Sequence, residues 1–154
     1  MLRTSLTLGA TLLLAAAGAC QKAPTAPTLA PVVTDTVDDK GATFKVEVSW
    51  RNTSPDEVEL VIEMAAAGIE QTDNLVVDVK TEGLVITEGT PDWTGFILPR
   101  ERYKHRVAYK LLDDETTDAT AALSIRRTLD SSLLWETELA FVRTETGGMT
   151  LVAG

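Results

Sequence analysis

The sequence is poor in the side chains on which most metal and redox sites depend. Its 154 residues include one cysteine, Cys20, and one histidine, His105. A single cysteine has no partner for an intramolecular disulfide, so the stability of the fold must come from packing. The usual zinc ligand sets and a Cys/His catalytic dyad are likewise excluded. We therefore expect no cofactor and no metal.

Basic residues are also few, with 14 Lys and Arg against 23 Asp and Glu and a formal net charge of −9. An acidic surface repels phosphate backbones, so the composition disfavours nucleic acid as a partner. The length suits one domain with a tail, not two domains.

The first twenty residues have the pattern of an export signal. Arg3 supplies a positive charge, residues 6–17 are apolar over a stretch too short for a stop-transfer helix, and small residues precede Cys20. The run Ala17-Gly18-Ala19-Cys20 resembles the lipobox of bacterial lipoproteins, although Ala17 stands where Leu is more common.

This resemblance implies cleavage of residues 1–19 and acylation of Cys20, which becomes the new N-terminus. Loss of Arg3 takes the formal charge from −9 to −10. Several acyl chains hold a protein firmly to a bilayer. Since Gln21 is not the Asp associated with inner-membrane retention, we expect the outer membrane of a Gram-negative bacterium, with the domain in the periplasm or at the cell surface.

Residues 20–41 are rich in Pro, Thr and Ala and contain Pro24, Pro27 and Pro31. Such a composition predicts a disordered tether, which could lift the domain by roughly 60 Å when extended. The folded domain is then expected over residues 42–154.

Apolar and polar residues alternate along most of that domain, which is typical of half-buried strands. Turn-forming residues separate the alternating stretches, at the spacing of a β-sandwich. Seven strands are predicted, within residues 43–50, 58–64, 75–79, 84–87, 103–111, 119–129 and 133–142. Because each strand has one apolar face, two sheets must pack together, and we expect an all-β, immunoglobulin-like antiparallel sandwich. Residues 144–154 are expected to hold a turn at Gly147-Gly148 and either a short edge strand or a frayed end.

One quarter of the chain, from Val76 to Leu112, resembles bacterial extracytoplasmic immunoglobulin-like modules. The matching residues are Gly83-Leu84 with Gly89, Trp93-Thr94-Gly95, and Leu98 with Glu101, while Arg100 replaces the usual Gly. The resemblance implies a sandwich used for binding or spacing at the cell surface, and it supplies no catalytic residue.

An unusual row of bases stands out in this acidic chain. Arg100, Arg102, Lys104, Arg106 and Lys110 share one parity, which places them on one face of a single predicted strand. One interpretation is cross-strand pairing with glutamates such as Glu57, Glu59, Glu136 or Glu138. The other is an anion-binding stripe for lipid or cell-wall anions or for an acidic partner protein.

Other candidates have ordinary structural interpretations beside functional ones. His105 shares a face with Tyr103 and Tyr109 and is expected to be a packed or rim histidine, the alternative being a catalytic base. The acidic loop from Asp113 to Asp118 is expected to be a polar turn, the alternative being a Ca²⁺ site. Three tryptophans are assigned to the core, with Trp93 as an alternative sugar-binding platform: Trp50, Trp93 and Trp135.

Together these features predict a membrane-anchored, non-enzymatic lipoprotein that serves as an interaction or accessory subunit of a cell-envelope assembly. Its expected partners are the membrane, through Cys20, and an envelope protein. The alternatives are a carbohydrate- or cell-wall-binding surface module and a small periplasmic hydrolase.

Overall fold

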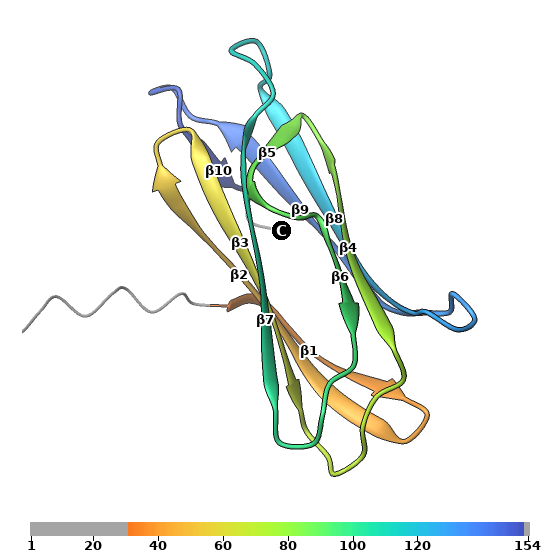
Figure 1. Ribbon diagram of the computed structural model, residues 1–154. Coiled ribbons are helices and arrows are strands. Elements are labelled where there is room, and N and C mark those ends of the chain that lie inside the picture. Colours follow the sequence, from red (N-terminus) through yellow and green to blue (C-terminus); the bar gives the residue numbers. More distant parts are fainter. Residues whose placement is uncertain (1–30, 153–154) are drawn as a thin grey trace, which may run out of the picture.

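A computed structural model describes residues 31–152, which form two antiparallel sheets packed face to face (Figure 1). Sheet A contains, in spatial order, β1 (Pro31–Asp39), β2 (Ala42–Ser54), β3 (Glu57–Ala66), β7 (Arg102–Leu111) and β5 (Leu84–Gly89). Sheet B contains β10 (Met149–Leu151), β9 (Leu133–Arg143), β8 (Asp118–Arg127), β4 (Leu75–Glu82) and β6 (Asp92–Gly95).

The pairing of the strands is that of an immunoglobulin-like sandwich, as predicted. In the immunoglobulin fold one sheet has the order A-B-E-D and the other contains C, F and G. Here β2-β3-β7-β5 and β9-β8-β4 occupy those places. These seven strands are the seven that the alternation predicts. The sheets are extended by β1, β6 and β10, the last being the short edge strand that was one of the two expectations for the C-terminal segment.

The predicted tether is wrong for residues 31–39, because this segment is an edge strand of sheet A. β1 pairs with β2 along its length, and the register places Val37 opposite Phe44 and Asp39 opposite Ala42. Val37 and Asp39 are buried, which gives the segment contacts that a free tether lacks. The domain therefore includes residues 31–41, whereas Cys20 and residues 21–30 lie outside the described residues.

The core lies between the sheets and follows directly from the alternation. Phe44, Val46 and Val48 on β2 are fully buried, as are Leu60 and Ile62 on β3. Successive side chains of a strand point to opposite faces, so each of these runs directs its apolar members inward. Trp50 and Phe141 bring the two sheets together by an edge-to-face contact, with ring centroids 6.0 Å apart.

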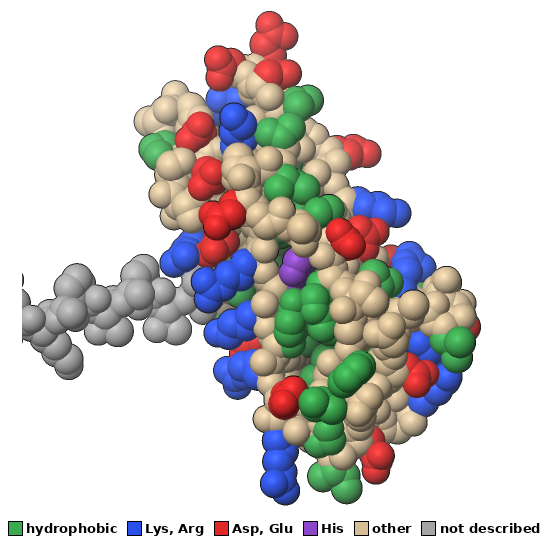
Figure 2. Space-filling view, in the orientation of Figure 1, with side chains coloured by type: hydrophobic (Ala, Val, Ile, Leu, Met, Phe, Trp, Pro, Cys, Tyr) green, Lys and Arg blue, Asp and Glu red, His purple; other side chains and the backbone are tan. Residues whose placement is uncertain are grey.

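The sandwich has two chemically different ends. At the end we call the apolar end, backbone hydrogen bonds join loop 67–74 to loops 96–101 and 128–132. At the opposite end, which we call the acidic end, loops 55–56, 112–117 and 144–148 meet. Figure 2 shows acidic side chains gathered at the top of the view and hydrophobic ones lower down.

Candidate interaction surface

The outer face of sheet A carries the basic row. Arg102, Lys104, Arg106 and Lys110 lie on β7 and are exposed, as their shared parity predicts. A column of Lys and Arg side chains is visible along this side of the molecule in Figure 2. Arg100 does not belong to the row, because it precedes β7 in a turn and its backbone has a φ of 65°. This left-handed conformation is one that Gly adopts more readily than Arg.

Two of the four strand bases are neutralised by one carboxylate. Glu63 on the neighbouring strand β3 accepts from Arg102 Nη1 at 2.7 Å and from Lys104 Nζ at 2.8 Å. Cross-strand pairing is thus confirmed for this half of the row, although Glu63 was not among the predicted partners. Of those partners, Glu57 lies opposite Lys110 without an ion pair, and Glu59 instead binds Arg51 at 2.7 Å. Glu136 and Glu138 lie on β9 in the other sheet.

The other half of the row is left without an ion pair within the described residues. Arg106 lies opposite Val61 and lines a hollow of about 220 Å³ beside Glu59 and Glu88. Lys110 lines a second hollow of about 260 Å³ with Asp56 and Asp113. Neither cation comes within 4.0 Å of a carboxylate oxygen in residues 31–152, although Lys110 lies directly opposite Glu57 on β3. Within the row, these two bases are therefore the ones without an ion pair.

The edge of sheet A beside these bases is open to a further strand. β5 pairs with β7 on one side, with Val85 opposite Lys110, and no other described strand pairs with its outer edge. A bulge between Ile86 and Glu88 interrupts the pairing, and Gly89 ends the strand with a φ of 84°. A side chain at Gly89 would approach the Arg106 carbonyl oxygen to 2.6 Å, which explains the glycine. The regular, unpaired edge is therefore short, from Leu84 to Ile86.

His105 is packed in the core, where it faces inward from β7. The residue is 6% exposed, and its Nε2 atom has no hydrogen-bond partner among the described residues. Burial lowers the pKa of His105 below its ordinary value, while a hydrogen bond to the Thr90 backbone and the charge of Asp92 act in the opposite direction. A base must reach its substrate's proton, and this ring is enclosed.

The three tryptophans pack against the core. Trp135 is buried and donates from Nε1 to Asp35 at 3.2 Å, and Trp50 is half-buried. Trp93 on β6 is half-buried and stacks on Tyr103, with ring centroids 4.1 Å apart and planes inclined at 29°. Tyr103 therefore covers one face of the Trp93 ring, a face that a sugar-binding platform would have to present.

The acidic loop at 113–118 is a polar turn, as expected. Asp113 Oδ1 accepts hydrogen bonds from the Glu115 and Thr116 backbone nitrogens at 3.0 and 2.8 Å, and from the Thr116 hydroxyl at 2.8 Å. The Thr116 bonds are the main reason that the pKa of Asp113 lies below its ordinary value. In the part of the chain that the structure describes, no cluster of three metal-ligating side chains occurs.

An ionic cluster that the sequence did not predict fixes β1 to sheet B. The Asp39 side chain is fully buried, and its Oδ1 accepts from Arg127 Nε and Nη2 at 2.8 and 2.6 Å. Arg127 Nη1 donates to Asp130 at 2.9 Å and to Ser132 at 2.8 Å. The Ser132 hydroxyl, together with Arg127, holds the pKa of Asp130 well below its usual range. This cluster is structural, because its members satisfy one another.

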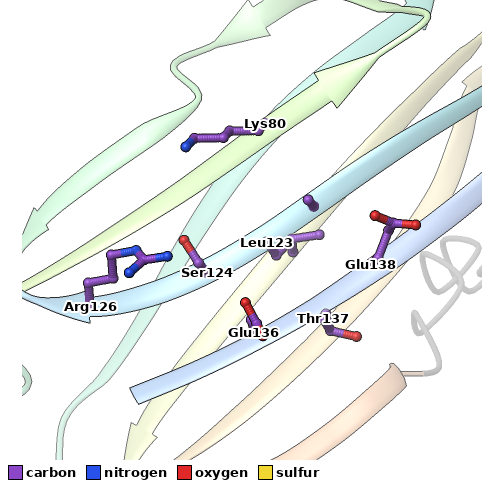
Figure 3. A pocket seen from close by; sticks show the side chains of 8 residues that line it. Lys80, Leu123, Ser124, Arg126, Glu136, Thr137 and Glu138 are labelled. Carbon is purple, nitrogen blue, oxygen red and sulfur yellow. The ribbon is translucent and has the colours of Figure 1, made fainter. Parts of the chain in front are cut away.

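The outer face of sheet B has a shallow hollow of about 480 Å³ with mixed charge (Figure 3). Lys80 and Arg126 lie on β4 and β8, whereas Glu136 and Glu138 project from β9. The outer face of sheet B thus carries side chains of both positive and negative charge, whereas the row on sheet A is basic.

Comparison with known proteins adds little beyond the architecture. No family model matches the chain, and no curated protein matches it. Among solved structures, the chain is similar to the GAE domain of GGA2p from Saccharomyces cerevisiae, with 11% sequence identity and a TM-score of 0.43. That match covers 71% of this chain and 96% of the other.

Helices of the length and hydropathy needed to cross a bilayer do not occur within residues 31–152.

Proposed function

We propose that this protein is a lipid-anchored, non-enzymatic lipoprotein that serves as an interaction or accessory subunit of a cell-envelope assembly. Cys20, preceded by Ala17-Gly18-Ala19, supplies the anchor in this proposal, and the outer membrane is its location. The observation that carries the proposal is the outer face of sheet A, where, within residues 31–152, Arg106 and Lys110 have no ion pair and the outer edge of the neighbouring strand β5 has no partner strand.

A partner strand adding to the edge of β5 is the docking mode that this geometry favours. Backbone groups of Leu84 to Ile86 would pair with the partner, and acidic side chains on it would meet Lys110 and Arg106. The opposite edge of sheet A is less suitable, because β1 begins with Pro31 and carries the buried charge of Asp39 on its inner face. An acidic, extended segment of another envelope protein is therefore the expected partner.

In-cell crosslinking of the full lipoprotein, followed by mass spectrometry, tests the proposal. We expect one discrete protein partner in the wild type, and we expect Arg106→Glu/Lys110→Glu to lose it because the docking surface becomes repulsive. The matched control is Lys80→Glu/Arg126→Glu, which makes the same charge change on the outer face of sheet B. The docking mode would be contradicted if no protein partner were found in any sample, or if both variants lost the partner equally.

The anchor is tested separately by the intact mass of the purified protein. An acylated N-terminal Cys20 is expected, and replacement by Ser should release the protein from membranes. Recovery of an unmodified chain beginning at Met1 would contradict the anchor.

A further inference from the structure

Three strongly exposed apolar side chains lie on neighbouring loops at the apolar end. Ile69 is 78% exposed, Leu129 is 81% exposed and Phe96 is 50% exposed. Their loops are joined by backbone hydrogen bonds, from Thr72 to Ile97 at 3.3 Å and from Thr128 to Asn74 at 2.8 Å. The three side chains therefore rise from one continuous surface and not from unrelated places.

This arrangement differs from an ordinary protein-binding groove. Single exposed apolar residues are common on soluble proteins, but a group on adjoining loops indicates a contact site. Ile69 and Leu129 lie within loops and Phe96 directly follows the end of β6, and the three side chains line none of the hollows on sheets A and B. Exposed apolar side chains on separate loops suit a deformable apolar layer, which can close around each of them, better than a rigid partner.

The length of chain between the anchor and the domain matches this geometry. Ten residues separate Cys20 from Pro31, and the eleven steps from one to the other span about 34 Å at ~3.1 Å per residue for a Pro-rich segment. β1 then runs from Pro31 to Asp39 at the apolar end, eight steps that span about 26 Å at ~3.3 Å per residue. A chain anchored at Cys20 is thus just long enough to place the apolar end on the same bilayer.

The charge distribution favours the same orientation. At the apolar end, Lys40 and Arg127 bind Asp39, Asp73 and Asp130, while the exposed acids Glu70 and Glu101 lie in the same joined loops as the exposed base Arg100. The acidic end carries Asp113, Asp114, Glu115, Asp118 and Glu145. An anionic bilayer repels the acidic end and leaves the apolar end free to approach.

We propose that the apolar end rests on the lipid bilayer that holds the anchor, with Ile69, Phe96 and Leu129 inserted at the level of the head groups. The inference rests on the lipid anchor of the proposed function. In this orientation the outer face of sheet A stays free for the partner strand. The domain is then held at a fixed orientation to the bilayer instead of tumbling freely on its spacer.

The test uses the full acylated protein in vesicles of phosphatidylethanolamine and phosphatidylglycerol, labelled with an environment-sensitive fluorophore. Thr128→Cys places the label beside Leu129, and Glu115→Cys places it at the acidic end as a control; both positions are exposed. We expect lipids brominated on their acyl chains to quench the label at position 128 and not the label at 115. Ile69→Ser/Phe96→Ser/Leu129→Ser should abolish this quenching, while Leu112→Ser at the acidic end should leave it unchanged.

Shortening the spacer tests the length argument. Deletion of residues 23–27 leaves five residues and six steps between Cys20 and Pro31, about 19 Å, which is too short for the apolar end to reach the bilayer. The quenching at position 128 should then disappear while the protein still floats with the vesicles. Floating protein whose label at 128 stays in water, or quenching that survives the deletion, would overturn the inference alone. Protein that does not float would overturn the anchor and the inference together.

Discussion

At the scale of single residues, His105 makes the stability of the domain depend on pH. Its pKa in the folded state lies below the ordinary value near 6.5 because the ring is buried. The unfolded state therefore binds more protons between those two pKa values, and folding stability rises with pH across that window. Its contribution is complete above about pH 6.5 and is lost as the pH falls toward the folded pKa.

We expect urea denaturation to show this loss below about pH 6.5, with a slope of at most about 1.4 kcal/mol per pH unit for one proton. His105→Leu should flatten the curve in that range. The carboxyl groups of Asp113 and Asp130 have lowered pKa values and titrate at lower pH, so they do not confuse the measurement. A His105→Leu curve with the wild-type slope would disprove the assignment.

Arg100 is a second residue whose conformation has a measurable cost. A non-glycine residue at a φ of 65° is strained, and Gly adopts this conformation freely. Arg100→Gly should raise the free energy of unfolding by about 0.5–1 kcal/mol after the greater entropy of unfolded Gly is included. Glu101→Gly at the next position is the control and should lower it. Thermal denaturation of both variants distinguishes strain relief from a general effect of glycine.

At the scale of elements, β1 is part of the folded domain. Deletions made in the domain with its spacer attached can test this. Deletion of residues 21–30 should leave the unfolding midpoint unchanged, whereas deletion of residues 31–39 should abolish cooperative unfolding. Asp39→Ala is a milder probe of the same strand, and we expect it to cost about 3 kcal/mol because Arg127 loses its buried partner. Equal midpoints for the two deletions in urea denaturation would show that β1 adds nothing to the fold.

The sequence predicted elements well where alternation was strong and poorly where it was not. In β1 the inward positions are Val33, Asp35, Val37 and Asp39, so charge breaks the apolar pattern and the segment was interpreted as tether. β6 has four residues and β10 has three, too few for a period to be recognised.

The candidate interaction surface could be predicted only where it depends on residues close together in the sequence. Parity placed Lys104, Arg106 and Lys110 on one face, because that depends only on neighbouring positions in one strand. The partner Glu63 could not be chosen from the sequence, since it follows from the pairing of β3 with β7. The Asp39–Arg127 pair joins residues 88 positions apart, and no local pattern connects them.

At the scale of the whole molecule, negative charge outweighs positive charge, and several of the acidic side chains gather at the acidic end. With a formal net charge of −9 the folded state repels itself, and dissolved salt screens that repulsion. The buried pair of Asp39 and Arg127 is screened much less than surface charges, so added salt should stabilise the protein on balance.

Raising NaCl from 10 mM to 150 mM should therefore raise the Tm by about 2–4 °C, the size expected for removal of weak surface repulsion. Asp114→Lys/Glu115→Lys should raise the Tm at low salt and reduce the further gain from NaCl, because it removes the repulsion at its centre. Asp113 is left unchanged in this variant, since its hydrogen bonds hold the turn. A Tm that falls with NaCl in the wild type would instead mean that ion pairs such as Glu63 with Arg102 and Lys104 outweigh the net charge, because these are the attractive contacts that salt weakens.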